Sequence, residues 1–243
     1  MGKIPKNPNE IFQDITKDYQ EAFGNDLISI ILYGSGASGE YVPKKSDFNF
    51  LIVLSEEGID TLERSFKVVS KWRNRNVSIP LFLTKDYVES SLDSFPVEFL
   101  NMKMNYTLVF GQDVLSDLSF DKGHLRVQCE RELKAKLLQL RQGYLDTSQA
   151  ARNMQSLVSR SIPAFIAVFR ALLHLKDIEV PAHKDSLVLR TCEEFHLDNK
   201  LFSTLLSLKN KEKKTPKQEM DSLLHSYIRE IRHLSSLVDN MEI

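Results

Sequence analysis

Residues 31–54, ILYGSGASGEYVPKKSDFNFLIVL, form the stretch that decides the fold. An apolar run ends in a glycine-rich turn, a basic loop follows, and a second apolar run begins with an acid and an amide. The chain has only 9 glycines, yet Gly34, Gly36 and Gly39 lie within six residues. Glycine permits tight backbone angles and a close approach by a ligand, so this turn is a candidate binding site.

The turn has the chemistry of a phosphate site. A strand that ends in Gly34 and Ser35 and then turns brings backbone N–H groups and one hydroxyl to the same place, which suits a phosphate. The spacing differs from that of a Walker loop. The alternative is a glycine-rich turn with only a structural role.

Asp47 and Asn49 open the second strand. Residues i and i+2 of a strand face the same side, so these two side chains should project together. Leu51 and Val53 would continue that face into the core. Two oxygen ligands beside a phosphate site suit a hard cation such as Mg²⁺. Alternatively, Asp47 caps a turn and Asn49 only fills a strand edge.

The composition is that of an ordinary globular protein. The chain has 243 residues, 42% of them hydrophobic and 27% charged, with a formal net charge of −1, which gives no support for a nucleic-acid surface. Cys129 and Cys192 lack metal-site spacing, so both are expected to be buried in a reducing compartment. No secretory signal and no apolar run near ~18 residues is evident, so we expect a cytoplasmic protein without membrane contact.

Element patterns predict an α+β fold with two domains. Residues 1–118 alternate helices and strands around a small mixed sheet, and residues 119–243 form an all-α antiparallel bundle. Helices are expected over 8–23, 58–75, 85–103, 122–146, 148–177, 184–196, 199–210 and 216–241, with an interruption of helix 85–103 near Pro96. Strands are expected over 26–34, 47–54 and 76–84 and within 106–115. In helix 58–75 the apolar face consists of Ile59, Leu62, Phe66 and Val69.

The segment 33–54 resembles the signature of the DNA-polymerase-β-like nucleotidyltransferase superfamily. In that family Gly-Ser closes a strand, small residues turn, and an Asp-x-Asp pair begins the next strand. The helical half resembles the bundle that follows this domain in kanamycin nucleotidyltransferase and its relatives. The resemblance implies transfer of a nucleoside monophosphate from an NTP to a hydroxyl acceptor, with pyrophosphate leaving.

The resemblance also assigns residues. Asp47 and Asn49 would be the catalytic pair that holds Mg²⁺ or Mn²⁺. The nucleotide contacts would be Gly34, Ser35, Lys45 and Ser46. Lys44 and Lys45 are equally compatible with a solvated loop.

Two departures from the family put catalysis in doubt. The second carboxylate is replaced by Asn49, and the predicted strand 76–84 contains no acid, with Ser78, Pro80 and Phe82 on the expected face. A two-metal mechanism needs concentrated negative charge, and here one of the three expected carboxylates remains. The substitutes we consider are Glu40, Asp93 and Glu98, although the last two also suit ordinary surface or capping positions.

Three functions stay open at this stage: a nucleotidyltransferase with altered ligands, a non-catalytic nucleotide-binding or regulatory module, and a ribonuclease. The ribonuclease would need an arginine and a histidine on one helix with four to six residues between them. The pairs Arg170–His174 and Arg229–His233 have only three residues between them, so we interpret them as ordinary helix-face residues. The acceptor is not identified, and the long apolar helix faces make a homodimer a reasonable expectation.

Overall fold

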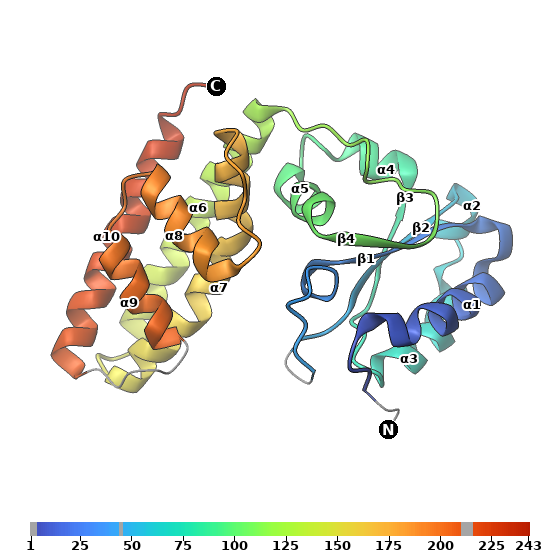
Figure 1. The fold of residues 1–243 in the computed structure, drawn as a ribbon, viewed down its shortest axis with the longest axis horizontal. Coiled ribbons are helices and arrows are strands. Elements are labelled where there is room, and N and C mark those ends of the chain that lie inside the picture. Colours follow the sequence, from blue (N-terminus) through green and yellow to red (C-terminus); the bar gives the residue numbers. More distant parts are fainter. Residues whose placement is uncertain (1–3, 44–45, 210–215) are drawn as a thin grey trace. The chain divides into compact units, whose positions relative to one another are not determined.

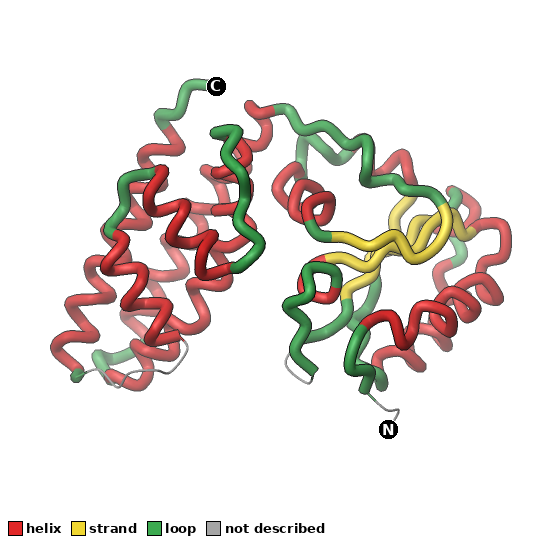
Figure 2. The backbone as a smooth tube through the Cα atoms, viewed as in Figure 1, coloured by secondary structure: helices red, strands yellow, loops and turns green. Residues whose placement is uncertain are grey.

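The computed structural model describes residues 4–43, 46–209 and 216–243 (Figures 1 and 2). The chain divides into two compact units, Met1–Phe120 and Asp121–Ile243. The first unit contains a sheet with helices, and the second is helical throughout its described elements. The predicted α+β class is confirmed.

The first unit contains a four-stranded mixed sheet in the order β3-β2-β1-β4. The strands are β1 (Leu27–Tyr33), β2 (Asn49–Leu54), β3 (Leu81–Thr84) and β4 (Tyr106–Gly111). Strand β1 runs antiparallel to both β2 and β4, whereas β2 and β3 are parallel. Pro80 precedes β3, which lies at an edge of the sheet, as expected for a residue without an N–H group.

Successive side chains of β1 and β2 point to opposite faces of the sheet, and both faces are apolar. Helices therefore cover both faces. Ile30 and Ile52 pack on the side of α1 and α3, and Ile31 and Leu51 pack on the opposite side with α5 (Figure 1). The helical elements here are η1 (Pro8–Ile11), α1 (Phe12–Phe23), η2 (Gly24–Asp26), α2 (Glu56–Ile59), η4 (Leu62–Ser65), α3 (Phe66–Arg73), α4 (Lys85–Ser90) and α5 (Pro96–Met104).

The single helix predicted over 58–75 is wrong. The segment contains α2, η4 and α3, and the break falls at Thr61, whose hydroxyl donates to the carbonyl oxygens of Glu57 and Gly58 in the preceding turn. The predicted buried face is also wrong at Phe66, which is 70% exposed. Trp72 is buried instead, and its indole Nε1–H donates to Asp18 Oδ2 of α1 at 2.8 Å.

The second unit is a bundle of α6 (Lys122–Asp146), α7 (Ala151–Leu175), α8 (Lys184–Glu194), α9 (Asn199–Lys209) and α10 (Lys217–Asp239). Two hydrogen bonds fix α6 and α10 antiparallel. Arg126 near the start of α6 donates to the carbonyl of Val238, and Tyr144 near its end donates to Asp221. Arg229 and His233 are exposed on α10, as the helix-face interpretation predicts.

Helix α7 is the one described helix that is long and apolar enough to cross a membrane, although no single apolar run predicted it. Half of its apolar window is buried within the protein, and the buried side chains include Phe165 and Phe169. A core helix of a bundle meets the same criterion. Both cysteines are buried as predicted, and burial raises the pKa of the Cys192 thiol to about 12.

Candidate functional site

The glycine turn Gly34–Gly36 follows β1 directly as a single 3-10 turn. Gly34 has a φ of +73°, which favours glycine, and its N–H donates to the carbonyl of Asn105 at 3.0 Å. A Cβ on Gly36 would lie 3.2 Å from both Leu32 and Phe48, so this glycine lets the turn pack onto the core. Gly34 therefore holds the turn in place, and its own N–H is not available to a ligand.

Ser35 carries the donors that remain. Within the described part of the chain, its backbone N–H group and its hydroxyl form no hydrogen bond, whereas Gly36 is buried and its N–H belongs to the 3-10 turn. The Ser35 side chain is half-buried at the surface of the turn. An amide and a hydroxyl on the same residue can bind the oxygens of one phosphate.

Asn49 lies beside this turn. It pairs with Tyr33 across β1 and β2, and it shares its sheet face with Leu51 and Val53, as predicted. Its Oδ1 accepts a hydrogen bond from Ser78 Oγ at 2.7 Å. Its Nδ2 lies 3.6 Å from the point where a Cβ on Gly34 would stand. Asn49 and Ser78 therefore form a neutral pair at the edge of the turn.

Asp47 lies outside β2, because the strand begins at Asn49 rather than at the predicted Asp47. The antiparallel pairing ends at Tyr33, since Gly34 turns away to Asn105. Phe48 forms only an isolated parallel bridge with Val77. Asp47 is exposed, so its carboxylate is accessible to a ligand.

Asn76 fixes the backbone on both sides of Asp47. Its carbonyl accepts from the Phe48 N–H at 2.9 Å, and its side-chain amide donates to the Ser46 carbonyl. Asn76 has a φ of +68°, a conformation that asparagine tolerates better than most residues. The position of Asp47 thus depends on a residue far along the chain.

Ser46 closes the loop that precedes Asp47. Its N–H donates to the Val42 carbonyl at 2.9 Å, and its hydroxyl accepts from the Val42 N–H at 3.4 Å. Tyr41 stacks on Phe48 with ring centroids 4.1 Å apart. Ser46 therefore has a structural role in the loop. Lys44 and Lys45, the expected cationic partners of the triphosphate, lie outside the described residues.

Two tyrosines flank the site without supplying a base. Tyr33 lies opposite Tyr106 across β1 and β4. Burial raises the pKa of the Tyr33 phenol, and burial together with the hydrogen bond to Asp113 raises the pKa of Tyr106 to about 12. Both phenols are therefore protonated near neutral pH, and neither accepts a proton from an attacking hydroxyl.

The described residues contain no group of three or more His, Cys, Asp or Glu side chains suited to hold a metal. The considered substitutes Asp93 and Glu98 are exposed around the start of α5, and Glu98 lies in its first turn. The Asn49 oxygen is neutral and accepts a hydrogen bond from Ser78. Mg²⁺ often binds through one carboxylate together with substrate phosphates, so Asp47 suits one ion, but the site does not suit two.

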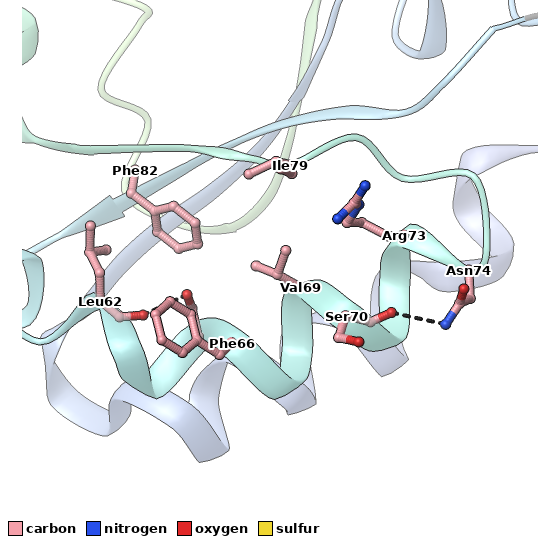
Figure 3. A pocket seen from close by; sticks show the side chains of 9 residues that line it. Leu62, Phe66, Val69, Ser70, Arg73, Asn74, Ile79 and Phe82 are labelled. Atoms are coloured by element: carbon pink, nitrogen blue, oxygen red, sulfur yellow. Dashed lines mark hydrogen bonds between the residues drawn. The ribbon is translucent and has the colours of Figure 1, made fainter.

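An apolar pocket of about 770 Å³ lies elsewhere, between η4, α3 and the segment leading into β3 (Figure 3). Its lining residues are Leu62, Ser65, Phe66, Val69, Ser70, Arg73, Asn74, Ile79 and Phe82. Phe82 pairs with Ile52, which packs on the α1 and α3 side of the sheet. Asn49 faces the other side, so this pocket is not part of the Gly34–Asn49 site.

Comparison with known proteins supports the fold. No protein-family model and no curated protein matches the sequence. Among solved structures, the spectinomycin adenyltransferase AAD(9) from Enterococcus faecialis, in complex with ATP and spectinomycin, matches with a TM-score of 0.51. The alignment covers 93% of this chain and all of that chain, at 14% identity. This chain has an adenyltransferase fold. The match includes the helical half, for which the sequence offered only an architectural resemblance.

Sequence reasoning missed Asn76 and Asn105, which hold the two ends of the site. It placed Ser78 on the expected face but did not predict its bond to Asn49. Asn76 could have been suspected from its residue type alone, because asparagine adopts a positive φ more readily than most residues. Nothing in the sequence pattern marks Asn105 as the acceptor for Gly34.

Proposed function

We propose that this chain binds a nucleoside triphosphate at the turn Gly34–Gly36 and transfers its nucleoside monophosphate to a hydroxyl acceptor. One observation carries the proposal: the unpaired donors of Ser35 lie in the turn beside Asn49, within a nucleotidyltransferase-type fold. AAD(9) was solved with ATP and spectinomycin, which supports ATP as the first nucleotide to test and a small hydroxyl compound as the acceptor.

In the proposed reaction, the acceptor oxygen attacks the α-phosphorus and the bond to the bridging oxygen of pyrophosphate breaks. The donors of Ser35 hold the triphosphate, and Asn76 positions Asp47. A Mg²⁺ or Mn²⁺ ion held by Asp47 would neutralise charge on the phosphates. With no base identified among the described residues, the hydroxyl proton passes to water. A missing base typically costs ~10²–10⁴ in rate, which predicts a slow enzyme.

A second candidate is a nucleotide-binding module without transfer. The Asn49–Ser78 pair favours it, since this pair is neutral where the related enzymes concentrate negative charge. The cytoplasmic location, the homodimer and the domain boundaries 1–118 and 119–243 also remain proposals.

Pyrophosphate release separates the two candidates. The parent protein is incubated with each of four NTPs, Mg²⁺ or Mn²⁺, and a panel of hydroxyl compounds that includes spectinomycin. We expect acceptor-dependent pyrophosphate release with at least one NTP, and none when EDTA is added. ATP binding without any pyrophosphate release would instead support the binding module.

A further inference from the structure

The two polar atoms of the Asn49 side chain face different neighbours. Oδ1 lies 2.7 Å from Ser78 Oγ, a length typical of O–H···O bonds and shorter than the usual N–H···O bond. The same hydroxyl also lies 3.0 Å from the Phe48 carbonyl, which is the longer of its two contacts. The shorter contact indicates that Ser78 donates to Asn49 Oδ1, which orients the amide with its oxygen toward Ser78.

The opposite atom, Nδ2, then faces the glycine turn. It forms no hydrogen bond with any residue that the structure describes, and it lies 3.6 Å from the position of a Cβ on Gly34. The unpaired donors of Ser35 belong to the same turn. Ser35 and Asn49 thus both offer hydrogen-bond donors there, and the Asn49 oxygen faces Ser78 rather than the turn.

We propose that Asn49 donates its side-chain amide to the triphosphate and does not ligate the metal, with Ser78 as the residue that positions it. This inference rests on the proposed function and refines it. A neutral donor at this position attracts the anionic phosphates directly, whereas a carboxylate would repel them unless a cation intervened. The site should therefore bind ATP in the absence of metal.

The test is ATP affinity, measured by calorimetry with EDTA and again with Mg²⁺, for the parent, Asn49→Ala, Ser78→Ala and Asn74→Ala. A hydrogen bond to a charged group is worth ~1.5–3 kcal/mol, so Asn49→Ala should weaken metal-free binding about tenfold or more. The ratio of the two affinities should stay unchanged. Ser78→Ala should give a smaller loss, because the amide is kept but no longer oriented. Asn74 is exposed at the end of α3, and Asn74→Ala should match the parent.

The outcomes are distinguishable. Unchanged metal-free affinity in Asn49→Ala, with loss of the Mg²⁺-dependent gain, would show that Asn49 is a metal ligand and overturn the inference alone. Absence of ATP binding by the parent in both conditions would overturn the proposed function and the inference with it. If Asn49→Ala does not fold, by circular dichroism, Ser78→Ala carries the test, and an unchanged metal-free affinity for that variant overturns the positioning role.

Discussion

Asp47→Asn is expected to lower pyrophosphate release about a hundredfold or more. A metal ion typically contributes several kcal/mol of transition-state stabilisation, and each 1.36 kcal/mol is a factor of ten in rate. Asp47 is the one exposed carboxylate that the structure holds next to Asn49 at the start of β2, where Asn76 fixes the chain. Metal-free ATP affinity should not fall, because the change removes a negative charge near the triphosphate.

Asp60→Asn is the matched control, since Asp60 is exposed at the end of α2 and its carboxylate forms no bond among those described. It should keep the parental rate. If the parent binds ATP without turnover, the same pair of variants is compared by the gain in ATP affinity on adding Mg²⁺, which Asp47→Asn should abolish. Release by Asp47→Asn within threefold of the parent would place the metal elsewhere, with Glu40, Asp93 and Glu98 as the next residues to change.

Trp72→Ala should lower the free energy of unfolding of the first unit by about 3–5 kcal/mol, the usual cost of removing a buried tryptophan. The Trp72 side chain is 1% exposed, bonds Asp18 through its indole N–H, and lies under the Arg75 guanidinium at 4.7 Å. Removal of the indole ring would leave a cavity in the core between α1 and α3. Amide hydrogen exchange in β1 and β2 across a urea series reports on this unit alone.

Phe66→Ala provides the control from the same helix. Phe66 is 70% exposed, and substitutions at such positions usually change stability by less than about 0.5 kcal/mol. Equal losses from the two variants would mean that the periodicity of the sequence, rather than the structure, identifies the buried face of α3.

The parts of the fold that depend on local pattern were predictable from the sequence. Helix α6 spans 122–146 as predicted, because Asp121 caps it by accepting from the His124 N–H at 2.9 Å. The period of two in β2 placed Asn49 on the face of Leu51 correctly. Such features are set by residues a few positions apart, which a sequence pattern records.

The site depended on contacts between distant residues. The start of β2 is set by Asn76 and by the turn at Gly34, neither of which changes the apolar alternation from which the strand was predicted. The buried face of α3 depends on Asp18 of α1, which accepts a hydrogen bond from the Trp72 indole. With Trp72 buried, Phe66 lies on the exposed side of the helix. The role of Asn49 depends on Ser78, and no single-sequence pattern encodes a hydrogen bond between β2 and the segment that precedes β3.

Thermal unfolding with ATP tests most directly whether the turn Gly34–Gly36 binds a triphosphate. ATP at a hundredfold excess over its dissociation constant should stabilise the parent by ~2.7 kcal/mol, whereas adenosine, which lacks phosphates, should have little effect. Ser35→Trp should fold normally, because Ser35 is half-buried at the surface of the turn, and it should lose the stabilisation by ATP. Ser90→Trp, at an exposed position at the end of α4, should keep it. Equal stabilisation of the parent and Ser35→Trp, or no stabilisation of the parent by any NTP, would contradict the account.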